Sequence, residues 1–345
     1  MAKTYNILYF GPSSLASTSF HRINALKRIG CQVLVIDPWE LIGRRARFKK
    51  WFDYQTGYRY LQERLLRKIC DVWSTLNYEA ELVWIDGGQL FGPEILKWIS
   101  KNIANKLILV NQDDPTGSRD CQRFKTLRRS LYYYDLCVFF RPETSLESLA
   151  LGAKRSLCVS FAYDEYFHTT QNADFSFNTD PVACFVGTLI PGENRDKFLL
   201  TLKQNSVPLR IYGNRWSRSP CWGSLRSSYC GPGLSGIDYA RILGGSQLNL
   251  GLLSHQNRDL ATTRSFEVPA CGGLLCAERT STHQLLYEEN VEAVFWDDVQ
   301  ECIDCCVNLL ASPDLCKKIS VAGKERVQSI GVGNEDLCRR ILAEI

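Results

Sequence analysis

The sequence predicts an α/β protein of two domains, each a doubly wound parallel sheet. Short apolar strands alternate with helices up to about residue 160, and a second alternating series begins at Val182. Between them, Tyr163–Asp180 is polar and lacks periodicity, which is typical of a linker. A length of 345 residues suits two ordinary domains. Strands that alternate with helices indicate parallel pairing with right-handed crossovers.

The first βαβ unit illustrates the pattern. The apolar strand Asn6–Phe10 ends at Gly11-Pro12-Ser13-Ser14, Ser17 or Thr18 caps a helix that runs through Ile29, and Cys31–Ile36 is the next strand. Further strands are expected at Glu81–Asp86, Leu107–Asn111, Leu136–Phe140 and Ser156–Ser160, and helices at Arg44–Arg67, Pro93–Ser100 and Thr144–Leu151.

The second series repeats this alternation. Its expected strands are Val182–Val186, Leu209–Tyr212, Leu248–Leu252 and Leu274–Ala277, and its helices include Arg195–Asn205 and Ile237–Leu243. Trp216–Gly236 has the composition of a loop. We therefore predict domains at 1–165 and 182–332, a linker at 166–181, and a C-terminal helix at 333–345.

Composition favours a soluble protein of a reducing compartment. Hydrophobic residues make up 45% of the chain, charged residues 23%, and the net charge is +4, too small to indicate nucleic-acid binding. The 15 cysteines lie mostly in apolar runs, where a free thiol behaves as a small hydrophobe. No signal peptide or membrane-spanning run is present, so we expect a cytoplasmic protein without disulfides. Cys302-x-x-Cys305 lies mid-helix without a second pair, and no metal site is expected.

The most informative motif is Asp259-Leu-Ala-Thr-Thr-Arg-Ser-Phe-Glu267, followed by Val268-Pro-Ala-Cys-Gly-Gly273. Thr262 or Thr263 is a candidate N-cap, and the free N–H groups of the helix then form an anion site. Glu267, one turn inside, is placed to accept hydrogen bonds from a diol. Nucleotide sites typically place a phosphate at a helix N-terminus and an acidic side chain nearby that binds the ribose hydroxyls. The alternative is an amphipathic helix with a solvated Glu.

These residues resemble the donor-binding half of the GT-B glycosyltransferases, in the group-1-like branch that includes CgeB-type proteins. The resemblance covers Asp259 to Val327: two acids eight positions apart, a small-residue helix, a Gly-rich turn into a strand, a strand and turn at Val294–Asp298, and closing helices at Val299–Leu310 and Leu315–Val327. It implies two Rossmann-like domains facing across a cleft and a C-terminal helix that crosses back to the first domain. It also implies a nucleotide-diphosphate sugar as donor with UDP-sugar favoured, no required cofactor or metal, and retention of configuration.

The resemblance also assigns roles to residues of the second domain. Glu267 would bind the ribose hydroxyls, and Asp259, where the family has Glu, would lie near the transferred sugar. Arg195 would grip the diphosphate. Thr188 stands where the family has a basic residue, and Arg264 is a candidate to supply the missing charge. His255 is expected to contact the sugar or phosphate, and Tyr212 to lie beside the base.

Candidate residues of the first domain lie at strand ends and on the first helix. The loop at Gly11 and Ser13 would approach the phosphates or the acceptor. His21 is a candidate acid or base because its pKa lies near neutrality. Asp86, or Asp113-Asp114, would orient the acceptor or act as a base; turn formation is the alternative for each.

The segment 44–52 mixes cations with aromatic residues. Such a face suits peripheral binding to an anionic membrane, at the inner face, and with it a lipid-linked acceptor. A solvated helix face is the simpler interpretation.

The sequence predicts a glycosyltransferase with an unknown acceptor (glycan, lipid-linked or small molecule). Two alternatives remain open: a catalytically degenerate GT-B module that binds a nucleotide sugar or glycan, which the departures at Thr188 and Asp259 favour, and a DNA-base glucosyltransferase, which would need a strongly basic cleft. A dehydrogenase is disfavoured because the first loop reads Gly-Pro-Ser-Ser rather than Gly-x-Gly-x-x-Gly.

Overall fold

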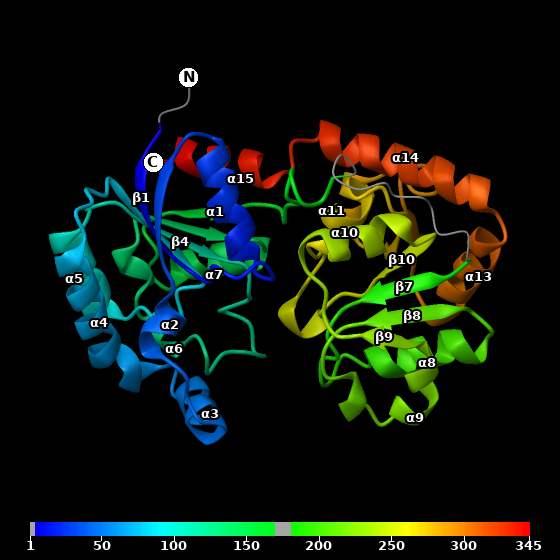
Figure 1. The fold of residues 1–345 in the computed structure, drawn as a ribbon, viewed down its shortest axis with the longest axis horizontal. Coiled ribbons are helices and arrows are strands. Elements are labelled where there is room, and N and C mark those ends of the chain that lie inside the picture. The colour runs from blue at the N-terminus through cyan, green and yellow to red at the C-terminus, as the bar shows by residue number, and fades with distance from the viewer. Residues whose placement is uncertain (1–3, 170–180) are drawn as a thin grey trace. The chain divides into compact units, whose positions relative to one another are not determined.

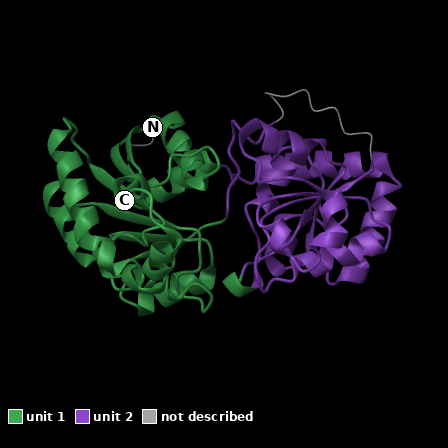
Figure 2. Cartoon of the chain, turned by 60° about the horizontal axis from the view of Figure 1, so that its bottom comes forward, with its two compact units in different colours: residues 1–160, 256–258, 334–345 green, residues 161–255, 259–333 purple. Residues whose placement is uncertain are grey.

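The computed structural model describes residues 4–169 and 181–345. The chain divides into two compact units (Figures 1 and 2). Unit 1 consists of residues 1–160, 256–258 and 334–345, and unit 2 of residues 161–255 and 259–333. Most of the linker expected at 166–181 lies outside the described residues.

Unit 1 is built on a six-stranded, wholly parallel sheet of order β2-β1-β3-β4-β5-β6. The core strands are apolar because helices cover both faces. The strands are β1 (Asn6–Phe10), β2 (Gln32–Ile36), β3 (Leu82–Asp86), β4 (Leu107–Asn111), β5 (Leu136–Phe139) and β6 (Ser156–Cys158). The helices are α1 (Thr18–Arg28), α2 (Pro38–Ile42), α3 (Arg47–Gln55), α4 (Gln62–Thr75), α5 (Pro93–Asn102), α6 (Lys125–Arg128), α7 (Pro142–Ala150) and α15 (Asn334–Ala343).

The single helix expected at Arg44–Arg67 is instead two helices, α3 and α4, separated by a turn and one turn of 3-10 helix. Gly57 and Tyr58 both take left-handed backbone conformations, with φ of 61° and 59°. A Cβ on Gly57 would lie 2.8 Å from the Cβ of Lys125, so the chain must turn where it passes α6. The break leaves α3 as a short helix at the margin of unit 1 (Figure 1).

Unit 2 contains a second parallel sheet, of order β12-β11-β10-β7-β8-β9. Its strands are β7 (Ala183–Val186), β8 (Leu209–Tyr212), β9 (Tyr229–Gly231), β10 (Leu248–Gly251), β11 (Leu275–Glu278) and β12 (Val294–Trp296). Its helices are α8 (Arg195–Gln204), α9 (Trp222–Leu225), α10 (Gly236–Gly245), α11 (Arg264–Ala270), α12 (Ser281–Leu286), α13 (Val299–Leu310) and α14 (Pro313–Ser329). Strand β9 and helix α9 lie in the stretch expected to be loop.

All fifteen cysteines are free thiols, as expected from their apolar settings. Among the described residues, no helix has the length and apolar character needed to cross a membrane.

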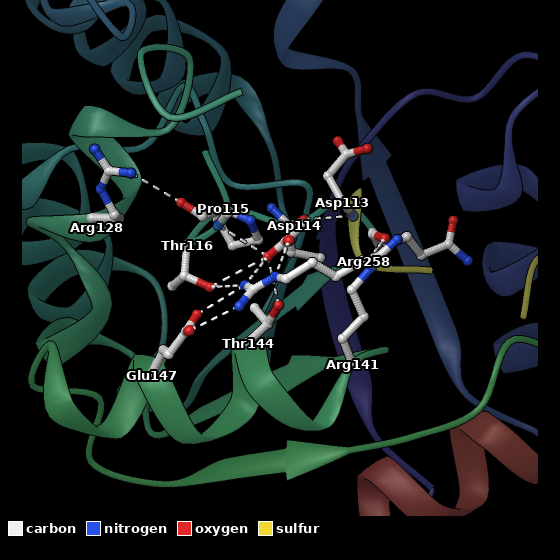
Figure 3. Close-up of polar contacts among 12 residues, drawn as sticks. Asp113, Asp114, Pro115, Thr116, Arg128, Arg141, Thr144, Glu147 and Arg258 are labelled. Atoms are coloured by element: carbon white, nitrogen blue, oxygen red, sulfur yellow. Dashed lines mark hydrogen bonds and ion pairs between the residues drawn. The ribbon is translucent and has the colours of Figure 1, made fainter. Parts of the chain in front are cut away.

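Residues 256–258 belong to unit 1 because Arg258 enters a cluster of polar side chains there (Figure 3). Its guanidinium donates to both carboxylate oxygens of Asp114, each at 2.7 Å, and to both of Glu147, each at 2.8 Å. Thr116 and Thr144 complete the cluster: Arg258 donates to Thr116 at 3.1 Å, and Thr144 donates to Asp114 at 2.7 Å.

Asp114 is the buried member of this cluster, with a side chain only 1% exposed. Burial alone would raise the pKa of its carboxyl, but the hydrogen bonds from Arg258 and Thr144 outweigh burial and hold that pKa below its usual value. Arg258 has a left-handed φ of 54°, a conformation that costs about 1–3 kcal/mol and persists because the ion pairs require it.

Gly213, which follows β8, tests the close packing of unit 2. Its φ is 145°, and a Cβ there would lie 2.0 Å from the carbonyl oxygen of Gly187. We expect Gly213→Ala to lower the free energy of unfolding by about 2–3 kcal/mol, through backbone strain and overpacking. Gly223→Ala is the matched control, because nothing lies within 4 Å of its added Cβ. Equal effects of the two substitutions in urea denaturation would contradict this account.

Arg258 gives a second prediction. In Arg258→Met the buried carboxylate of Asp114 loses its partner, and we expect a loss of about 3 kcal/mol in the free energy of unfolding. Arg241→Met removes an arginine that is 58% exposed and pairs only with Asp238, so it should cost less than about 0.5 kcal/mol. Denaturant unfolding at neutral pH measures the stability of both variants. If Arg258→Met is as stable as Arg241→Met, the cluster around Asp114 does not stabilise the protein.

Candidate functional site

The candidate site of unit 2 lies where the strand order of its sheet reverses, between β7 and β10. Open parallel sheets bind ligands outside the carboxyl ends of the strands at such a switch point. The chain leaves β7 at Gly187–Thr188 and leaves β10 at Leu252–His255. These two loops, with α11, frame the candidate site.

Arg195, at the start of α8, joins the two loops. Its guanidinium donates to the carbonyl oxygen of Thr188 at 3.1 Å, and to those of Leu253 at 2.8 Å and Leu252 at 3.3 Å. The residue is only 5% exposed. This differs from the expected grip on a diphosphate: Arg195 satisfies backbone carbonyls at the strand ends and so fixes the shape of the switch point.

Arg264, the first residue of α11, brings the other positive charge to this place. Its Nη2 lies 3.3 Å from where a Cβ on Gly187 would be, so the guanidinium lies against the end of β7. Its Nε is buried, and within residues 4–169 and 181–345 it has no hydrogen-bond partner. Arg264 therefore lies beside the loop where Thr188 departs from the family pattern, and its role as the missing cation stays a prediction.

Glu267 lies one turn further along α11 and is 6% exposed. The hydroxyl of Tyr239, on α10, donates to its Oε2 at 2.5 Å. Burial and the Glu267 carboxylate raise the pKa of Tyr239 well above its ordinary value, so this tyrosine stays protonated and remains a donor. His168 Nδ1 lies 4.0 Å from Oε1 of Glu267, but it accepts the backbone N–H of Asp164 at 3.0 Å. That nitrogen therefore carries no proton, and the pair is not an ion pair.

The start of α11 is not capped as the sequence suggested. Thr263 occupies the N-cap position with helical φ and ψ, and its side chain makes no capping bond. Ser265 makes the side-chain hydrogen bonds at this end of the helix instead. Its hydroxyl accepts the N–H of Thr262 at 3.1 Å and donates to Nε2 of His283 at 2.8 Å. The helix α11 has seven residues.

His283 is fully buried and orients this network. Its Nδ1 donates to the carbonyl oxygen of Glu278 at 2.7 Å, which leaves Nε2 to accept from Ser265. Burial lowers the pKa of His283 below its ordinary value, so the ring is neutral as the network requires. Neither His283 nor Tyr239 carries a local sequence signal that would identify its role.

His255 follows β10 and is exposed, but both of its ring nitrogens face carboxylates. Nδ1 lies 3.1 Å from Glu193 and Nε2 lies 2.6 Å from Glu278. Burial opposes charge on the ring, yet the two carboxylates outweigh it and raise the pKa of His255. The imidazolium is therefore engaged within the protein, which differs from the expected contact with a sugar or phosphate.

Two further residues that the sequence singled out lie near these loops. The half-buried Asp259 donates its backbone N–H to the carbonyl oxygen of Ser254 at 3.3 Å. Tyr212, at the end of β8, accepts the N–H of Gly187 on its carbonyl at 2.9 Å. The predicted roles of Asp259 beside the sugar and of Tyr212 beside the base stay predictions.

In unit 1, Asp86 at the end of β3 pairs with the buried Arg22 at 2.7 Å, and the Tyr9 hydroxyl donates to the same oxygen at 2.5 Å. This carboxylate is thus the partner of a buried arginine, not the open base that the sequence suggested. His21 is 8% exposed within α1, not on the helix surface. Gly11 donates its N–H to the carbonyl of Ile36 at 3.2 Å, and Ser13 is exposed in the bend that follows.

Comparison with known proteins gives one family match and several structures of the same fold. A family model described as glycosyl transferase-like matches residues 195–330, which include Arg195, Arg264 and Glu267. No curated protein matches the chain. Among solved structures, sucrose-phosphate synthase from Thermosynechococcus elongatus has a TM-score of 0.71 at 12% identity, covering 98% of this chain and 97% of that one.

Two further structures share the fold. HepE from Anabaena, in complex with UDP-glucose, has a TM-score of 0.63 at 13% identity, over 99% of this chain and 98% of its own. An alpha-glucosyltransferase in complex with UDP and a 13-mer DNA has a TM-score of 0.66 at 10% identity, over 99% of this chain and 100% of its own. The predicted fold class is confirmed, whereas the narrower CgeB-type resemblance stays a prediction. Residues 195–330 thus match a glycosyl transferase-like family model, in a chain with the two-sheet architecture of the GT-B fold.

Proposed function

We propose that the protein is a glycosyltransferase that uses a UDP-sugar as donor and binds it at the switch point of unit 2. The observation that carries the proposal is the placement of Arg264 and Glu267 on one face of α11, three residues apart, with the guanidinium against the end of β7. The UDP and UDP-glucose held by structures of the same fold support the choice of nucleotide.

Each side chain then has a separate task. Arg264 would balance the charge that develops on the leaving diphosphate, in place of a metal ion, and such charge stabilisation is the main catalytic contribution expected in this chemistry. Glu267 would accept the ribose hydroxyls, with Tyr239 holding the carboxylate in orientation. Arg195 acts indirectly, because it fixes the loops that border the phosphates.

Asp259 and His21 remain the predicted groups near the reacting sugar and acceptor, and retention of configuration remains the predicted outcome. The acceptor is assigned to unit 1 by this proposal. Fifteen free thiols favour a reducing compartment, so we propose that the enzyme acts in the cytoplasm, with segment 44–52 at a membrane surface.

Donor binding is tested by thermal shift with UDP, GDP, ADP, CMP and dTDP, without added metal. Ligand at a hundred times its Kd stabilises the native state by about 2.7 kcal/mol, so a nucleotide that binds is readily detected. We expect a shift with UDP that Glu267→Ala and Arg264→Met each abolish.

The matched controls are Arg241→Met and Glu325→Ala, which remove exposed charges of unit 2 from α10 and α14. Both should keep the UDP shift. A shift that survives Glu267→Ala and Arg264→Met would place the nucleotide elsewhere. UDP binding without release of sugar from any UDP-sugar, to water or to added acceptors, would favour the degenerate-module alternative.

The network behind α11 predicts a pH dependence. Because the folded pKa of His283 is lowered, its contribution to stability is complete above about pH 6.5, the unfolded value, and is lost as pH falls below it. We expect His283→Gln to be less stable than the wild type at neutral pH but to lose less stability on acidification, by up to about 1.4 kcal/mol per pH unit.

His255 is the opposite control. Its raised pKa stabilises the protein below about pH 6.5 and that contribution fades as pH rises through the folded value. As pH falls, we therefore expect the free energy of unfolding to drop more steeply in His255→Gln than in the wild type. In His283→Gln it should drop less steeply. Urea denaturation between about pH 5.5 and 7.5 measures both. An unchanged pH dependence in His283→Gln would show that its ring does not titrate as the network requires.

A further inference from the structure

Unit 1 contains a cavity of about 690 Å³ beside α2 and α3. Its apolar walls come from Trp39, Ile42, Tyr54, Tyr58 and Leu61. Ile42 and Leu61 are almost fully buried, so the floor belongs to the core of unit 1. A space of this size with aromatic and aliphatic walls is typical of a site for an apolar group.

Charged side chains border the same cavity. Arg45 is paired with the buried Asp53 at 2.9 Å, so these two charges cancel. Arg44 and Lys50 also line the cavity, and among the described residues neither has a carboxylate partner. Glu40 is the one other acid that lines it. With Arg45 and Asp53 paired, the two cations Arg44 and Lys50 outnumber the one acid Glu40, so the cavity carries a net positive charge beside an apolar interior, which suits a ligand with an apolar body and an anionic head.

Helix α3 relates this cavity to an aromatic surface. Lys50, Asp53 and Tyr54 share one side of the helix, which faces the cavity. Phe48, Trp51 and Phe52 share the adjacent side and are 73%, 59% and 40% exposed. The rings of Phe48 and Trp51 stack 6.2 Å apart, and Phe52 stacks on Tyr60 at 5.4 Å.

Exposed aromatic rings grouped on one helix face, with cations beside them, are typical of a surface that enters the interface of an anionic membrane. An anion taken from solution would need the cations and the cavity but not these rings. The occupant that uses all three features is a lipid that carries a phosphate.

We propose that the cavity between α2 and α3 binds the apolar chain of an anionic lipid, with its phosphate at Arg44 and Lys50 and with the aromatic side of α3 in the membrane surface. This site goes beyond donor binding and does not depend on it, because every residue involved belongs to unit 1. The lipid is either an anchor for the enzyme or the carrier of its acceptor, and both use the same phosphate and chain.

The site is tested with two probes on the full-length protein. Dodecyl phosphate, kept monomeric, is titrated calorimetrically beside inorganic phosphate. Vesicles of phosphatidylcholine, with or without about a third of phosphatidylglycerol, are used in flotation, since the anionic component supplies the negative surface potential. We expect dodecyl phosphate to bind and inorganic phosphate not to, and the protein to float only with the anionic vesicles.

Paired substitutions separate the cavity from the surface. Arg44→Gln with Lys50→Gln should weaken both kinds of binding by roughly 30-fold, since a cation near an anionic surface contributes about 1 kcal/mol. Phe48→Ser with Trp51→Ser should reduce flotation but leave dodecyl phosphate binding unchanged. The matched controls are Arg67→Gln with Lys68→Gln, which neutralises exposed cations of α4, and Tyr132→Ser, which removes an exposed ring.

The proposal is overturned if dodecyl phosphate does not bind, if inorganic phosphate binds equally well, or if the α4 control loses binding as much as Arg44→Gln with Lys50→Gln. Nucleotide binding is measured on the same variants. UDP should still stabilise Arg44→Gln with Lys50→Gln, so that a failure of the lipid site and a failure of the donor site give different results.

Discussion

The hydrogen bonds of Arg195 are the constraint on which the site of unit 2 depends. One buried guanidinium satisfies carbonyl oxygens at the ends of β7 and β10, the two neighbouring strands at which the sheet reverses its order. Those carbonyls would otherwise be buried without partners, which costs about 1–3 kcal/mol each. Because these bonds of Arg195 go to the backbone, and because Arg264 lies against the end of β7, our proposal gives the diphosphate charge to Arg264.

The residues around Glu267 and its helix also shape this site. The carboxylate is buried, and a buried charge needs donors. Tyr239, on α10, donates a hydrogen bond to this carboxylate. The hydrogen bond between Ser265 and His283 holds the start of α11 in place. The helix is thus positioned by tertiary contacts on two sides, not by a cap of its own. This explains how a helix of seven residues, with a proline inside it, holds two functional side chains in fixed directions.

The sequence predicts what local pattern determines. The alternation of apolar strands with helices is enough for both sheets, and the candidate caps Thr262 and Thr263, with the family motif around them, are enough to place the start of α11. It fails for partners that tertiary packing brings together. Asp86 and Arg22 are 64 positions apart, and Tyr239 and Glu267 are 28 apart. No periodicity reveals such pairs, so the sequence did not show that Asp86 pairs with Arg22 or that Arg195 bonds to backbone carbonyls. Strand β9 was missed because it lies within 216–236, a stretch rich in serine and glycine, which are typical of loops.

The division of the chain also bears on biosynthesis. Unit 1 takes its first 160 residues from one end of the sequence but needs Arg258 to neutralise the buried Asp114, and α15 to pack against α1. A ribosome therefore releases most of unit 1 long before the segments that complete it, whereas unit 2 is nearly continuous in sequence and has all its strands within reach. Contacts between such distant segments close slowly. During synthesis, unit 1 therefore stays incomplete, with apolar surface exposed, until these late segments emerge. Aggregation and chaperone binding are favoured at this stage.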